Sequence, residues 1–155
     1  MGYLLLAFAA FLGFAVSLWC HVLSWLHIDP PLGKTSMMLH FGIFAVFLPS
    51  MILANKAVSP SVGKKDGFSY VMTALPNWIP KTAPYLGAYF VFNFFYGMYL
   101  TSPYPKGSVP LYLDIRIFSG HWMLFYGMSA LASVGLFRLS RKNRATNIEP
   151  PNNNP

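Results

Sequence analysis

The sequence predicts an all-α membrane protein in which four transmembrane helices form an antiparallel bundle. Hydrophobic residues make up 55% of the 155 residues and charged residues only 10%, whereas a soluble domain carries about 25% charged residues. Four long stretches, 4–26, 36–54, 84–100 and 117–137, also contain no Asp, Glu, Lys or Arg, and a helix needs about 20 apolar residues to cross a bilayer. The chain has too little charge to cover a water-soluble surface.

The helices are expected at about 4–26, 36–54, 83–101 and 115–137. The connection between the first two is short and contains Pro30, Pro31 and Gly33, which predicts a tight hairpin between neighbouring antiparallel helices. The fourth helix opens with Arg116, which we expect to reach the outer headgroups and to pair with Asp114.

The long loop between the second and third helices contains an amphipathic pattern. Its apolar residues follow the spacing i, i+3, i+4, i+7, with Asp66 placed ahead of them as an N-cap. We expect a short interfacial helix in this cytoplasmic loop, anchored by Trp78; the alternative is an irregular loop lying on the headgroups. The residues of the pattern are Phe68, Val71, Met72 and Leu75.

Residues 1–144 are expected to form a single transmembrane domain, and residues 145–155 a disordered cytoplasmic tail. With four spans, both termini and the middle loop share one side of the membrane, and the positive-inside rule then places them in the cytoplasm. We expect the membrane to be the bacterial inner membrane. The shared side carries eight basic residues (Lys56, Lys64, Lys65, Lys81, Arg138, Arg141, Lys142, Arg144) and the other side three (Lys34, Lys106, Arg116).

The net charge of +7 does not indicate nucleic-acid binding, because the basic residues lie between and after the apolar stretches. Topology and attraction to anionic lipid account for them better. Cys20 is the only cysteine, which excludes an intrachain disulfide and zinc-finger spacing.

Three histidines are expected at a common depth in the outer leaflet, because each lies four or five residues inside the outer end of a predicted helix. That distance corresponds to about 6–8 Å. A shared depth would allow His21, His40 and His121 to hold a haem, a metal ion or a quinone. The alternative is that they are hydrogen-bonding or interfacial side chains. No buried carboxylate accompanies them.

Polar side chains on the third helix are expected to form one seam through the bilayer, within an arc of about 120°. Asn93 lies near mid-depth, where an unpartnered amide is costly, so it should find a hydrogen-bond partner. The seam either stabilises the bundle or lines a slot for a ligand or quinone. Its members are Tyr85, Tyr89, Asn93, Tyr96 and Tyr99.

The chain contains no Gly-rich phosphate loop, no nucleophile elbow and no paired carboxylates in its spans. We therefore expect a non-enzymatic accessory or scaffold subunit of a larger membrane complex, whose partners are membrane lipids and other membrane-protein subunits. One alternative is a redox or metal protein that uses the outer-leaflet histidines. Another is a carrier of lipid or of a small apolar ligand, which would use the tyrosine seam.

Overall fold

The computed structural model describes residues 2–57 and 67–148, except for the side chains of 143–148. These residues form an all-α fold, as predicted. The elements are α1 (Gly2–Trp25), the 3-10 helix η1 (Gly33–Met38), α2 (Leu39–Ala57), α3 (Gly67–Met72), α4 (Trp78–Thr101) and α5 (Leu111–Ile148).

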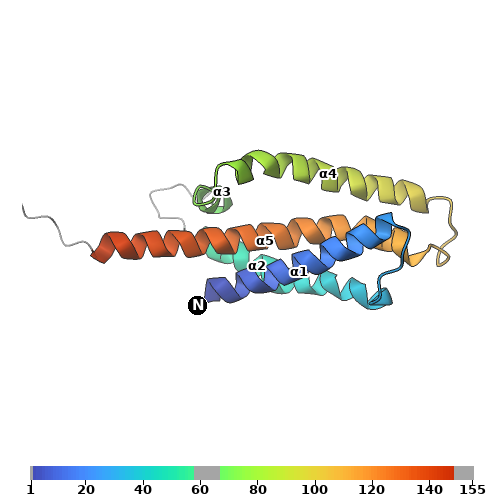
Figure 1. Ribbon diagram of the computed structural model, residues 1–155, viewed down its shortest axis with the longest axis horizontal. Helices are drawn as coiled ribbons and strands as arrows, with labels where there is room; N and C mark the ends of the chain where they lie inside the picture. The colour runs from blue at the N-terminus through green and yellow to red at the C-terminus, as the bar shows by residue number, and fades with distance from the viewer. Residues whose placement is uncertain (1, 58–66, 149–155) are drawn as a thin grey trace, which may run out of the picture.

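Helix α5 is the central element of the fold, with α1 and α2 packed on one side and α4 on the other (Figure 1). It has 38 residues, which corresponds to about 57 Å at 1.5 Å per residue. The beginning of α1, the end of α2, α3, the beginning of α4 and the end of α5 gather at one end of the molecule. The long helices are therefore antiparallel to their neighbours in the chain.

Within the residues that the structure describes, three helical stretches are long and apolar enough to cross a membrane: Gly2–Trp25, Gly33–Ala57 and Leu111–Lys142. These three agree with predicted spans. Helix α4 is 24 residues long but contains four tyrosines, Asn93 and Lys81, and it does not meet the same criterion of hydropathy. The coarser prediction of an apolar, membrane-type helical protein is supported, and a fourth span is not confirmed.

Several element boundaries differ from the predicted ones. Helix α5 begins at Leu111 and continues to Ile148, because leaving a bilayer does not require a helix to end. It includes the first four residues of the predicted tail, and residues 149–155 lie outside the described part of the chain. The second helix is preceded by η1 rather than by a simple turn. A short helix, α3, does form in the middle loop, but Asp66, its expected N-cap, lies outside the described residues.

Glycines allow α5 to approach its neighbours closely. The Tyr126 side chain of α5 lies between α1 and α2, where a Cβ atom at either Gly13 or Gly42 would overlap it. Its hydroxyl donates a hydrogen bond to the carbonyl of Leu39 at 3.0 Å. On the other side of α5, a Cβ at Gly97 would lie 2.7 Å from the Ile117 side chain. Small residues at these crossings let the backbones pack at short range.

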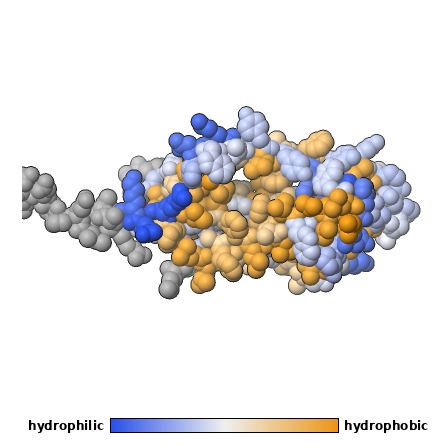
Figure 2. Space-filling view, viewed as in Figure 1, coloured by the Kyte–Doolittle hydropathy of each residue, from blue (hydrophilic) through white to orange (hydrophobic). Residues whose placement is uncertain are grey.

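The surface and interior of the bundle reverse the pattern of a soluble protein. Ten polar or charged residues of the described part of the chain are buried, and many large apolar side chains on α1, α2 and α4 are exposed. Hydrophobic residues cover the middle of the molecule, and hydrophilic residues gather at its two ends (Figure 2). This distribution suits a bilayer, where lipid contacts the apolar outer faces and polar groups need partners within the protein.

Candidate functional site

Two histidine clusters and an apolar groove lie around the first half of α5, and His21 is at the centre of one cluster. His21 is only 5% exposed and joins three helices. Its Nδ1 lies 2.8 Å from the Ser119 hydroxyl on α5, and its Nε2 lies 2.6 Å from the Tyr89 hydroxyl on α4. The indole N–H of Trp25, one turn later on α1, donates to the same Nε2 at 3.1 Å.

These contacts define the tautomer of His21. An indole nitrogen can only donate a hydrogen bond, so the Nε2 atom of His21 must accept one. The proton of the neutral imidazole then lies on Nδ1 and is donated to Ser119. Tyr89 donates to Nε2, and the Ser119 hydroxyl is left to donate toward the carbonyl of Arg116 at 3.4 Å. Both imidazole nitrogens are therefore engaged within the protein.

Arg116 lies directly beside this cluster and is 3% exposed. The expectation that it reaches the outer headgroups and pairs with Asp114 is wrong. Its guanidinium instead donates to the carbonyl of Ser24 and lies over the Trp25 ring, with its central carbon 4.5 Å from the ring centroid. The carbonyl dipole of Ser24 and the aromatic face of Trp25 provide the electrostatic stabilisation that a carboxylate would otherwise supply.

Asn93 completes the junction between α4 and α5. Its side-chain N–H₂ donates to the carbonyl of Arg116 at 2.8 Å, which is the kind of partner predicted for a buried amide. A Cβ at Gly120 would lie 2.9 Å from the same nitrogen. The amide therefore fits against α5 only because that position lacks a side chain.

The other two histidines form a separate pair between α2 and α5. The Nε2 atoms of His40 and His121 are 3.0 Å apart. The indole N–H of Trp122 donates to Nδ1 of His40 at 3.0 Å. Nδ1 of His40 is therefore an acceptor, so its Nε2 carries the proton and donates it to His121. The proton of His121 then lies on Nδ1.

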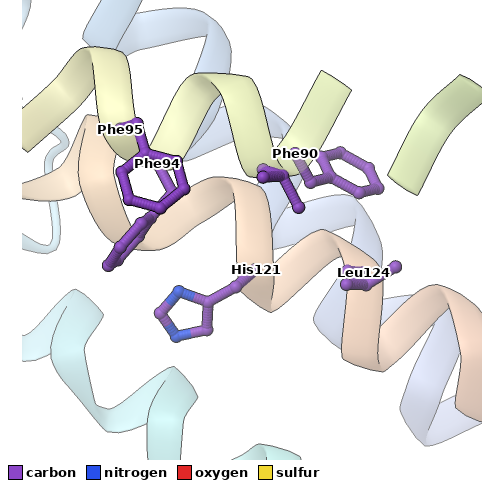
Figure 3. A pocket seen from close by; sticks show the side chains of 6 residues that line it. Phe90, Phe94, Phe95, His121 and Leu124 are labelled. Atoms are coloured by element: carbon purple, nitrogen blue, oxygen red, sulfur yellow. The ribbon is translucent and has the colours of Figure 1, made fainter. Parts of the chain in front are cut away.

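His121 also borders a shallow apolar groove of about 290 Å³ between α4 and α5. Figure 3 shows the imidazole extending from α5 below Phe90, Phe94 and Phe95, which line the groove from α4. One side of the His40–His121 pair is thus bounded by phenyl rings.

The structure brings His40 and His121 together but places His21 in a different cluster. Among residues 2–57 and 67–142, no group of three or more His, Cys, Asp or Glu side chains is arranged to hold a metal ion. The fourth histidine, His27, lies outside both clusters and packs edge-on against Tyr112, with ring centroids 5.2 Å apart. The prediction that three histidines hold a cofactor remains a prediction, without a common centre to support it.

The tyrosines of the predicted seam have different surroundings. Tyr89 contacts His21, and Tyr96 stacks on Trp25 with centroids 6.0 Å apart. Tyr85 and Tyr99 are 78% and 73% exposed, respectively. The seam therefore divides into an inner part with Asn93 and an outer part on the surface of α4.

Several contributors to these clusters were not identified as site residues from the sequence. They include Ser119, Trp25, Trp122 and the backbone carbonyls of Ser24 and Arg116. Arg116 and Ser119 lie three residues apart on α5 and so share a face of the helix. That spacing was a signal that polar groups of α5 converge. The partner of each group depends on how the helices are rotated, which a spacing does not specify.

A comparison of the chain with protein-family models, curated proteins and solved structures gives no match.

Proposed function

We propose that the protein is a non-enzymatic integral membrane protein that serves as an accessory or scaffold subunit of a larger membrane complex. In this proposal four helices cross a bacterial inner membrane, both termini lie in the cytoplasm, and α3 lies at the cytoplasmic interface. The observation that carries the proposal is an exposed aromatic stripe on α4.

The proposal of a fourth span is supported by the length and placement of α4. Its 24 residues correspond to about 36 Å, enough for a hydrocarbon core of about 30 Å. Its buried polar side chain, Asn93, is partnered by α5. Lys81 lies in the first turn, where its ammonium can extend to the headgroups.

A structural role for the histidines is supported by their hydrogen bonds. Metal ligation requires a free nitrogen lone pair, and the second nitrogen of a ligating histidine normally donates its proton to an acceptor. In His40, by contrast, Nδ1 accepts a hydrogen bond from Trp122 and so has no proton to donate. In His21 the unprotonated nitrogen already accepts from Trp25 and Tyr89. These hydrogen bonds hold the helices together and occupy the histidine nitrogens. The outer surface of the bundle is then the region available for binding a partner.

The aromatic stripe consists of Tyr85, Phe92 and Tyr99, which follow one another at steps of seven residues on α4 and are 78%, 63% and 73% exposed. Steps of seven return to nearly the same face of a helix. Tyrosine hydroxyls facing hydrocarbon lack hydrogen-bond partners, which is costly. A neighbouring transmembrane helix with polar side chains would satisfy them, so the stripe suits a protein partner better than lipid.

Site-specific photocrosslinking in native membranes tests this proposal. A benzophenone amino acid at Phe92 should give an adduct with another membrane protein, identified by mass spectrometry. The matched control is the same substitution at Phe44 on α2, which is 62% exposed and should yield lipid adducts only. If Phe92 gives adducts only with lipid, or only with a second copy of this chain, the proposal is contradicted. Isolation of the protein as a lone monomer in mild detergent would also contradict it.

A second candidate function, as a redox or metal protein, is favoured by one observation. The Nε2 atoms of His40 and His121 face one another at 3.0 Å, close to the separation of about 3.3 Å expected for two ligands of a tetrahedral ion bound at 2.0–2.1 Å. An absorbance spectrum and metal analysis of the purified protein distinguish the two functions. A stoichiometric metal or chromophore that is lost on His121→Gln, and kept on His27→Gln, would favour the second.

A further inference from the structure

We propose that an apolar groove between α1, α4 and α5 binds one acyl chain of an anionic phospholipid of the cytoplasmic leaflet. The inference goes beyond the proposed subunit role and rests on α4 lying in the bilayer in the proposed orientation. The groove has a volume of about 300 Å³. Apart from Trp78, which precedes Tyr85 by seven residues, its lining on α4 lies on a different face from the aromatic stripe.

The groove is long, narrow and apolar. Its α4 wall runs from Trp78 through Leu86 to Phe90, and its α1 wall is formed by Phe11 and Phe14. Gly127 forms part of the floor on α5, and a Cβ there would meet Phe14 at 3.5 Å. The one hydroxyl on the α4 wall, that of Thr82, donates to the carbonyls of Trp78 and Ile79 at 3.0 and 3.1 Å. The lining therefore offers dispersion contacts and no free polar group.

The dimensions of the groove match one leaflet. Trp78 and Phe90 are 12 residues apart on one helix, which corresponds to about 18 Å along the axis. Half of a hydrocarbon core of about 30 Å is about 15 Å. Trp78 is 65% exposed at the end where a tryptophan marks the interface. A chain lying in the groove would extend from the headgroup region to the middle of the bilayer.

Basic side chains stand at the interfacial end of the groove. Arg138 follows the lining residue Leu131 by seven positions on α5, so it lies on the same helix face two turns farther out. It is exposed and donates to the carbonyl of Ala74 at 3.3 Å, which leaves other guanidinium N–H groups for a phosphate. Lys81 lies next to Thr82 on α4 and is also exposed. This charge selects an anionic headgroup over a zwitterionic one.

Native mass spectrometry of the full chain, released from nanodiscs of phosphatidylcholine and phosphatidylglycerol, tests the acyl-chain site. The chain should retain one phosphatidylglycerol molecule. Ala83→Phe, which fills the groove from α4, should lower the retained fraction at least about fivefold by steric exclusion. Ala88→Phe is the matched control, because Ala88 is exposed on the same helix outside the lining, and it should retain the lipid as wild type does.

The headgroup half of the site is tested in the same experiment. Lys81→Gln and Arg138→Gln should each reduce the preference for phosphatidylglycerol about fivefold, the effect expected of one basic residue near an anionic lipid. Arg138→Lys keeps the charge and should restore the preference, and Lys106→Gln, at the other end of the molecule, should leave it unchanged. Retention without headgroup preference, no retained lipid, or equal retention in the Ala83→Phe and Ala88→Phe variants would overturn the proposal.

Discussion

The imidazoles of His21, His40 and His121 act as hydrogen-bond junctions between helices. A histidine can accept at one nitrogen while it donates at the other, so a single side chain can link two helices without a net charge. His21 links Tyr89 on α4 to Ser119 on α5. His40 accepts a hydrogen bond from the indole N–H of Trp122 and donates one to His121. In a bilayer interior such neutral junctions avoid the cost of burying an unpaired charge.

The tryptophan donors predict different tautomers for two histidines. His21 should be protonated at Nδ1, because Trp25 donates to its Nε2, and His40 should be protonated at Nε2, because Trp122 donates to its Nδ1. Nitrogen-15 NMR of labelled histidine in lipid nanodiscs reads these states directly. Trp25→Phe should leave Tyr89 as the remaining donor to Nε2 of His21 and alter only the His21 signals. The reverse tautomers in wild type would refute the assignment.

The Asn93 amide should make a measurable contribution to stability. Asn93→Leu removes the hydrogen bond to the Arg116 carbonyl and should lower the free energy of unfolding by about 0.6–2 kcal/mol, the range for a polar contact between membrane helices. Unfolding in mixed micelles of increasing SDS content measures this change. The control is Tyr99→Phe, since Tyr99 is exposed and its loss should be neutral in the isolated chain. Equal destabilisation by both variants would contradict the role of Asn93.

Among the described helices, α5 has the most extensive contacts with the other long helices. Its contacts depend on large side chains facing glycines. Tyr126 fits against Gly13 of α1 and Gly42 of α2, and Ile117 fits against Gly97 of α4. Because Tyr126 fits only where α1 and α2 have glycines, this contact sets the rotation of α5 relative to those two helices.

A double-mutant cycle distinguishes the two glycines that face Tyr126. Gly42→Ala places a methyl group against the Tyr126 hydroxyl, whereas Gly13→Ala places one against ring carbons. Each should cost about 1–3 kcal/mol of unfolding free energy through overpacking. Tyr126→Phe removes the hydroxyl and should relieve Gly42→Ala but not Gly13→Ala, as measured by unfolding in mixed micelles. Strict additivity in the Gly42 cycle would argue against this contact.

The position of the long helices follows from the sequence more readily than their rotation. Uncharged stretches locate α1, α2 and α5, because hydropathy depends on composition alone. The buried partner of Asn93 was expected for a physical reason, the cost of a stranded amide. The division of the three histidines into two clusters was not foreseen, since depth is read from residue number, whereas the direction of a side chain around its helix depends on the packing of Tyr126, Ile117 and similar residues.

The whole molecule has the surface of a membrane protein, and the role of α4 determines its topology. If α4 crosses the bilayer, Lys81 and Lys106 lie on opposite sides; with only three spans they lie on the same side. On a Cys20→Ala background, Lys106→Cys should react with a membrane-impermeant maleimide in intact spheroplasts. Lys81→Cys should react only after the membrane is permeabilised. Labelling of both without permeabilisation would exclude the four-span arrangement.

The order of synthesis gives the central place of α5 a consequence for biogenesis. A ribosome makes the chain from its N-terminus, so the helix that supplies Ser119, the Arg116 carbonyl and Tyr126 emerges last. Until then, Asn93 is inserted without its hydrogen-bond partner, and His21 lacks the partner at its Nδ1. Assembly of the bundle is therefore a late event. A nascent chain that stops before Leu111 lacks the helix against which its earlier helices pack.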